Sequence, residues 1–205
     1  MEWYSILLMA ILALMLIYTL YREFSNRKKK DRVLTQLSKA LLSKDFDTYD
    51  KLLFENQKLF SVFNRSLMML QANIAKDDYA EVNDNIKAFL EVKLTGKQKQ
   101  IVFNIAFNYY MSKEKYKSAK ACLNKLRETD DAYLIHNSEI MYNTFAEKGH
   151  KYLDELLDIK EEDLDEETKI RNEYLISEMY KNKGDLKLSD SYRQKYENSL
   201  NNLNK

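Results

Sequence analysis

Residues 103–123 read FNIAFNYYMSKEKYKSAKACL, and this stretch decides the fold. Its first half carries large apolar residues at steps of three and four, from Phe103 to Tyr110. A polar turn at Glu114 follows, and the apolar steps resume at Tyr116. Steps of three and four place side chains on one face of a helix. The stretch therefore predicts two amphipathic helices joined by a tight turn.

The same arrangement recurs along the chain. Each time, an amphipathic pattern ends in a short polar turn, and the next pattern begins with a ring-bearing or apolar residue. A recurrence about every 34 residues is the signature of stacked helix–turn–helix repeats. Because the chain has no proline and only 3 glycines, strands joined by tight turns are not expected. The first residues after the turns are Phe46, Tyr79, Tyr116, His150 and Leu186, at intervals of 33, 37, 34 and 36.

The third of these units resembles the tetratricopeptide repeat, a family with small, large and aromatic residues at set places in two antiparallel helices. The resemblance covers roughly residues 32–196. It lacks the proline that often closes such repeats, and Phe107 and Leu70 stand where a small residue is usual. It implies an α-solenoid of about five helix–turn–helix (TPR-like) repeats over residues 33–198, with residues 199–205 as a frayed tail. The matching residues are Phe103, Phe107, Tyr110, Tyr116, Ala119 and Leu123.

The N-terminal residues form a separate element. From Trp3 to Tyr21 the sequence WYSILLMAILALMLIYTLY carries no charge, proline or glycine. A helix of about 19 residues spans roughly 30 Å, the thickness of a bilayer's hydrocarbon core. We therefore predict a single transmembrane helix over residues 1–21. The predicted fold class is all-α, with this helix followed by the α-solenoid.

Basic residues crowd into residues 22–32, directly after the apolar stretch. Lys and Arg beside a transmembrane end remain in the cytoplasm, so the sequence predicts a single-pass membrane protein with a cytoplasmic C-terminal domain. The same charges would also contact the anionic headgroups of a lipid bilayer. They are Arg22, Arg27, Lys28, Lys29, Lys30 and Arg32.

Residues that perform catalysis or hold metals are sparse. Cys122 is the only cysteine, which excludes an intrachain disulfide and a four-thiolate zinc site. It falls on the apolar face of the predicted helix 116–126, which indicates a buried and unreactive thiol. His150 takes the place that an aromatic or apolar residue has in the other units, which favours a half-buried packing side chain. We predict that the chain is not an enzyme and takes no cofactor or metal.

The segment 161–167, EEDLDEE, is strongly acidic. It offers charge to a cation or a basic partner, but it lacks the alternating ligands and the glycine of a calcium loop. Acids before a helix also suit its positive N-terminal end, which favours a solvated loop. Asp163 with Glu166, and Thr95 with Gln98, predict capping boxes. The formal net charge of +1 provides no overall field to attract nucleic acid.

The resemblance also places a set of side chains in the groove where such folds bind extended or helical peptides. Asn104 and Asn108 would bond to a peptide backbone, and Tyr142 and Tyr174 would supply aromatic contacts. The predicted function is a membrane-anchored protein–protein interaction or assembly scaffold. Its expected partners are the bilayer and an unidentified protein or peptide, with a homo-oligomer retained as an alternative. The groove residues are Gln71, Asn104, Asn108, Ser138, Tyr142, Arg171, Tyr174 and Glu178.

A second interpretation stays open beside this one. An extracytoplasmic chaperone-like accessory subunit of a secretion or envelope machine would share the fold and have the opposite topology. The frequent use of Tyr, Lys and Asn is typical of an AT-rich bacterial genome. The groove residues themselves can also be read as ordinary surface positions.

Overall fold

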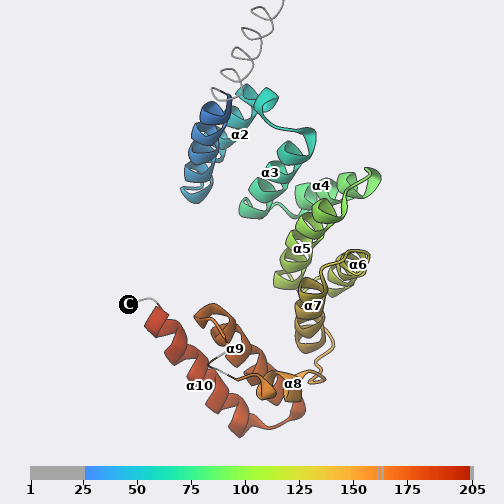
Figure 1. Ribbon diagram of the computed structural model, residues 1–205, viewed down its shortest axis with the longest axis vertical. Helices are drawn as coiled ribbons and strands as arrows, with labels where there is room; N and C mark the ends of the chain where they lie inside the picture. Colours follow the sequence, from blue (N-terminus) through green and yellow to red (C-terminus); the bar gives the residue numbers. More distant parts are fainter. Residues whose placement is uncertain (1–25, 161, 163, 204–205) are drawn as a thin grey trace, which may run out of the picture. The chain divides into compact units, whose positions relative to one another are not determined.

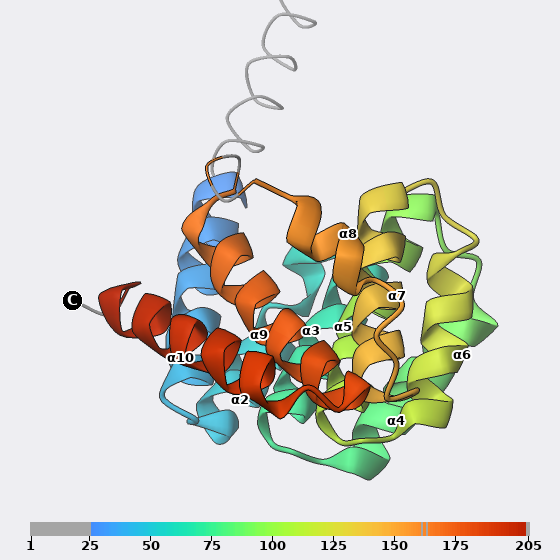
Figure 2. The same ribbon diagram turned by 90° about the horizontal axis from the view of Figure 1, so that it is seen from below.

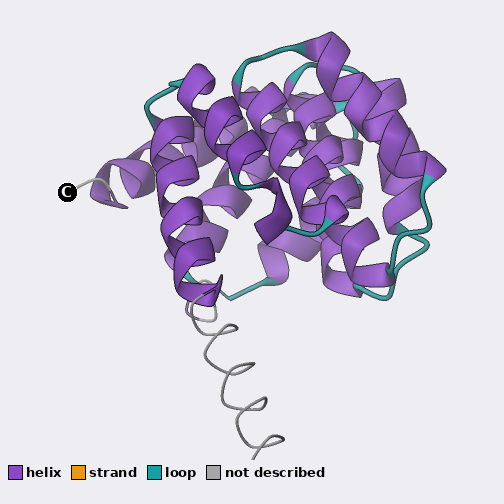
Figure 3. Ribbon diagram, turned by 90° about the horizontal axis from the view of Figure 1, so that it is seen from above, coloured by secondary structure: helices purple, strands orange, loops and turns teal. Residues whose placement is uncertain are grey.

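The computed structural model describes residues 26–160, 162 and 164–203, and in those residues all regular structure is helical, with no strand (Figure 3). The prediction of an all-helical chain is confirmed for this part. Few residues interrupt the amphipathic patterns, so helices form wherever an apolar stripe can be buried. By their contacts the residues fall into two compact units, divided between Glu91 and Val92.

In its described residues, the first unit consists of two helix pairs (Figure 1). The Tyr49 hydroxyl on α2 donates a hydrogen bond to the Met68 carbonyl on α3 at 3.0 Å and ties the pairs together. The elements are a helix over residues 26–42, α2 (Phe46–Glu55), η1 (Gln57–Leu59), α3 (Val62–Ala75) and α4 (Tyr79–Glu91). The main buried cluster is Val33, Leu37, Ala40, Tyr49, Leu53, Phe60 and Ala72.

The second unit contains the remaining described helices. Helices α5 and α6 pack along each other, as do α9 and α10, which lie side by side in Figures 1 and 2. Helix α7 packs against α5, α6 and α9, and the short α8 packs against α9. The bounds are α5 (Gly96–Ser112), α6 (Tyr116–Leu126), α7 (Ala132–Phe145), α8 (Leu153–Asp158), α9 (Glu166–Lys183) and α10 (Leu186–Leu203).

One type of backbone joint connects the helices within most pairs. Lys44 has a φ of 57°, in the left-handed region, and its amide donates to the Leu41 carbonyl at 3.2 Å. The next amide, that of Asp45, donates to the Ala40 carbonyl at 2.9 Å. This pair of bonds is the Schellman arrangement, which satisfies the last carbonyls of a helix. Both bonds and a positive φ recur at Asp77, Glu114 and Gly184.

These left-handed joints (Lys44, Asp77, Glu114 and Gly184) confirm four of the predicted turns. The helices after them begin at Phe46, Tyr79, Tyr116 and Leu186, as the sequence pattern predicts. Because the same joint recurs, the described chain consists of packed helix pairs and is compatible with a helical repeat fold.

The remaining predicted turn, at Gly149, differs from these joints. The Gly149 amide donates to the Asn143 carbonyl at 2.8 Å, and the Asn182 side chain donates to the Gly149 carbonyl at 3.0 Å. These bonds hold the following residues outside a helix, so α8 begins only at Leu153. His150 is exposed, and its predicted role as a half-buried packing residue is therefore wrong. Leu153 is buried in its place.

The predicted fold class needs a correction at its membrane part. Across residues 26–160, 162 and 164–203, no helix combines the length and the apolar surface needed to cross a membrane. Helices α9 and α10 have 18 residues each, but charged side chains such as Lys187 and Arg193 interrupt them on every turn. This finding overturns the prediction of a transmembrane helix followed by a solenoid and leaves its all-helical part. The predicted span Trp3–Tyr21 lies outside the described residues.

The ends of the helices follow the sequence signals in part. The capping box at Thr95 and Gln98 is confirmed, because each side chain accepts a hydrogen bond from the other residue's amide. Asp163 lies outside the described residues, and the N-cap observed at α9 is Asp165, which accepts from the Thr168 amide at 2.8 Å. Helix α10 runs on through the segment expected to fray, as far as Leu203. The domain bounds of 33–198 stay a prediction.

Candidate protein-binding groove

An open cavity of about 680 Å³ lies between α2 and α3 in the first unit. We call it the α2–α3 groove. Asp50, Phe54 and Gln57 line it from the α2 side, at steps of four and three, and so share one helix face. The α3 side chains that line it are Val62, Arg65, Ser66, Met69, Ala72, Asn73 and Lys76.

Two polar contacts bridge the groove. The Lys76 ammonium lies 2.8 Å from the Asp50 carboxylate. Arg65 donates a hydrogen bond from Nη1 to the Gln57 side-chain oxygen at 2.9 Å. Since numbering rises from Asp50 to Gln57 along α2 and falls from Lys76 to Arg65 along α3, the two helices run antiparallel. The contacts therefore bracket the space between the helices near both ends.

The groove between these bridges is apolar and open. Phe54 is 74% exposed, Val62 is 70% exposed and Met69 is 50% exposed, although all three line the same cavity. Single exposed apolar residues are common on protein surfaces, but grouped ones in a hollow are typical of binding sites. Their exposure costs free energy that a partner would recover by covering them.

Arg65 brings a positive charge into this apolar setting. The residue is half-buried, and its Nε is buried without a hydrogen-bond partner. Among the residues that the structure describes, its printed partner is the neutral Gln57, and no carboxylate pairs with it. A buried donor left without an acceptor costs roughly 1–3 kcal/mol, so the site favours a ligand that brings an acceptor.

The groove predicted from the family resemblance lies elsewhere. Gln71 is exposed on α3 but does not line the α2–α3 groove, and the other predicted residues belong to the second unit. On α5, the Asn108 amide nitrogen donates to the Asn104 side-chain oxygen at 3.1 Å. Ser138 is buried, and its hydroxyl donates to the Leu134 carbonyl at 2.8 Å, so it offers no surface to a partner.

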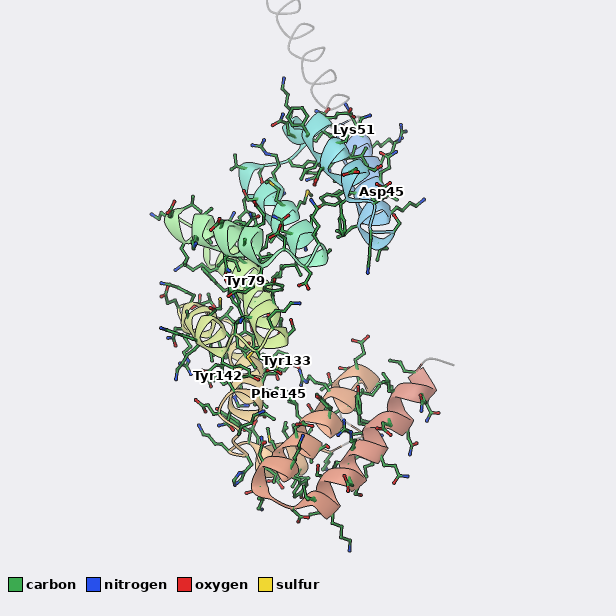
Figure 4. The ribbon with its side chains drawn as sticks, turned by 180° about the vertical axis from the view of Figure 1, so that it is seen from behind. Asp45, Lys51, Tyr79, Tyr133, Tyr142 and Phe145 are labelled. Carbon is green, nitrogen blue, oxygen red and sulfur yellow. The ribbon has the colours of Figure 1, made fainter. Side chains whose placement is uncertain are left out.

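Aromatic rings make most of the contacts around the rest of that predicted set. Tyr142 and Phe145 come from α7 (Figure 4), and the Lys120 ammonium lies 5.6 Å from the centre of the Tyr142 ring. The Tyr174 ring on α9 lies 5.8 Å from the Phe145 ring and 5.1 Å from the Tyr196 ring. Burial is the main cause that raises the pKa of Tyr174. This row of rings packs α7, α9 and α10 together and leaves Tyr174 only half exposed.

The charged members of the set lie beside Tyr174 on α9. Arg171 donates from Nε and Nη2 to the Asn172 side-chain oxygen, at 3.4 and 3.2 Å. The Glu178 carboxylate lies 3.7 Å from the Lys181 ammonium. Steps of three and four bring Arg171, Tyr174 and Glu178 onto one face, as predicted from the register. Their role in binding stays a prediction.

The basic residues after the apolar stretch lie on the helix over residues 26–42. Arg27, Lys28, Lys29 and Arg32 are exposed there, as a surface that meets headgroups or a protein requires. Lys30 is half-buried, with its ammonium 6.0 Å from the centre of the Phe60 ring. Arg22 lies outside the described residues.

Cys122 is buried on α6, as the sequence pattern predicts. Burial raises the pKa of its thiol from 9.0 to about 12, so the thiolate at pH 8 is about a thousandfold rarer than on an ordinary cysteine. We expect Ellman's reagent to modify the folded chain at least a hundredfold more slowly than the chain in 6 M guanidinium, roughly in line with that scarcity. Equal rates in the two conditions would show that Cys122 is reachable.

Comparison with protein-family models, with curated proteins and with solved structures finds no match to this chain. Function therefore has to be inferred from the geometry of the described residues. The sequence pattern did not point to the α2–α3 groove. Its only signal is a surplus of apolar residues, since Phe54 follows the inward-facing Leu52 and Leu53 directly and cannot share their side of the helix.

Proposed function

We propose that this chain is a protein–protein interaction module, a degenerate helical repeat that binds a segment of a partner protein in the α2–α3 groove. The observation that carries the proposal is the exposure of Phe54, Val62 and Met69 within one cavity between two bridged helices. Binding energy in protein interfaces is concentrated in a few apolar anchors at the centre, with polar groups around them. The groove has this composition.

The tetratricopeptide-like character belongs to the same proposal. Two features support it: turns at intervals close to 34 residues, and the left-handed joint that recurs at most of them. Repeat proteins of this kind present helix faces as docking surfaces for other proteins. A scaffold role fits that architecture. The cytoplasmic location inferred from the basic cluster stays a prediction, and binding in the groove does not depend on it.

A photo-cross-linking amino acid placed in the full chain tests the groove in cells. We expect benzoylphenylalanine at position 54 to capture a defined partner that the same residue at position 42 does not capture. Leu42 is a matched control because it is 84% exposed in the same unit and does not line the groove.

The captured partner is then purified and its Kd for the full chain is measured. Phe54→Ala with Met69→Ala is expected to weaken binding by about 2 kcal/mol or more, near thirtyfold, because both anchors are truncated. Leu42→Ala is expected to leave the Kd unchanged. A partner that binds both variants as tightly as the wild type uses another surface, and the proposal for the groove is then wrong.

A further inference from the structure

The charges along the α2–α3 groove are distributed unevenly. Arg65 lies near the start of α3, with the neutral Gln57 as its partner. At the far end of α3, Lys76 is paired with Asp50. Beyond it, Asp78 and Glu81 line the groove from the start of α4, and no cation within the described residues pairs with either. The groove is therefore positive at one end and negative at the other.

We infer that the segment bound in the groove is an amphipathic helix of another protein, with an acidic side chain placed against Arg65. This inference rests on the proposed function and specifies the chemistry of the partner. A carboxylate would supply the acceptor that Arg65 lacks, in a charge-assisted hydrogen bond. Lys76 cannot take that role, because its ammonium is already bound to Asp50 at 2.8 Å.

The secondary structure of the partner follows from the walls of the groove. Helices form both walls, and their backbone groups are bonded within the helices, so the walls provide no strand edge for an extended peptide. A helix satisfies its own backbone and needs only side-chain contacts. From Val62 to Lys76 the groove follows α3 for roughly 21 Å, which is the length of about four helical turns.

The apolar anchors fit the same occupant. Phe54 faces the groove from α2, while Val62 and Met69 face it from α3, two turns apart. A helix laid along the groove would meet them with apolar residues at steps of three, four and seven. Asp78 and Glu81 disfavour further acids at the end of the partner that lies over them. The expected partner therefore carries its acid at one end of the apolar stripe only.

A display library of amphipathic helices about four turns long, with the positions flanking the apolar stripe randomised, tests this inference on the full chain. We expect the wild type to enrich Asp or Glu at one flanking position. Binding of the selected peptide is then measured by fluorescence anisotropy. Replacing its acid by Lys is expected to weaken binding at least tenfold. The variant Arg65→Glu is expected to reverse that preference.

The control is Arg32→Glu, which changes an exposed charge in the same unit outside the groove and is expected to keep the wild-type preference. Circular dichroism checks that Arg65→Glu folds, and Arg65→Gln supplies a milder variant that should abolish the preference without reversing it. Peptides with Glu and Lys that bind equally, while Phe54→Ala with Met69→Ala abolishes both, would overturn the acidic assignment and leave the groove as a docking site.

Two further outcomes separate the inference from the proposed function. If no helix is enriched while the cross-linked partner still needs Phe54, the partner is not an amphipathic helix and only the inference fails. If the cross-link at position 54 joins two copies of this chain, the occupant is the chain itself and the inference is overturned as well. A partner that ignores the groove variants overturns the proposed function and the inference together.

Discussion

Replacing Phe107 by Ala is expected to lower the free energy of unfolding of the second unit by about 3–5 kcal/mol, as truncation of a fully buried Phe does. Phe107 is 0% exposed on α5, which packs against both α6 and α7. The loss combines the transfer free energy of the ring with the cost of the cavity left behind. A change this large is a substantial part of the stability of a typical domain.

Asn108→Ala is the matched control, because Asn108 is the next residue on the same helix and is exposed. Its side chain bonds only to that of Asn104 among the interactions observed here, so its removal should change the free energy by no more than about 0.5 kcal/mol. Urea unfolding followed by circular dichroism measures both variants. A loss below about 1 kcal/mol for Phe107→Ala would show that α5 can close over the missing ring.

A second substitution, Glu173→Met, is expected to raise the free energy of unfolding by about 1–4 kcal/mol. Glu173 on α9 is 6% exposed, and its Oε2 is buried without a hydrogen-bond partner in the described part of the chain. It lines a cavity of about 70 Å³ beside Leu156, Ile176 and Tyr192. A carboxylate in such a place loses its hydration and gains no bond in return. Met has a similar volume and suits the apolar neighbours.

The same substitution at Glu197 supplies the comparison. Glu197 lies on α10, its side chain is 62% exposed, and its ion pair with Arg193 is a surface contact at 3.8 Å. Surface changes of this kind stay within about 0.5 kcal/mol. If thermal and urea unfolding show Glu173→Met to be less stable than the wild type, then Glu173 has a partner whose loss outweighs the relief of a buried charge.

The sequence pattern is sufficient for features that depend on neighbours along the chain. The joints at Lys44, Asp77 and Glu114 follow a polar turn flanked by apolar stripes, and the stripes alone determine where the helices can begin and end. Burial of Cys122 follows from its place in the stripe of α6. The capping box at Thr95 is likewise a local property of the chain.

Features that depend on contacts between distant segments could not be predicted in this way. The late start of α8 depends on hydrogen bonds from Asn182 to Gly149 and to Thr144, residues far away in the sequence. The exposure of Phe54 depends on how far α3 stands from α2, and spacing alone does not encode that separation. Ser138 fitted the register of the predicted groove, but the packing of α7 buries it.

The left-handed joints have a consequence for thermal tolerance. Lys44, Asp77 and Glu114 hold a side chain in a conformation that suits glycine, at a cost of about 1 kcal/mol each. This strain is local to the connections and touches neither the helix faces nor the α2–α3 groove. The chain thus has a reserve of heat resistance that an engineer can reach without altering any surface offered to a partner.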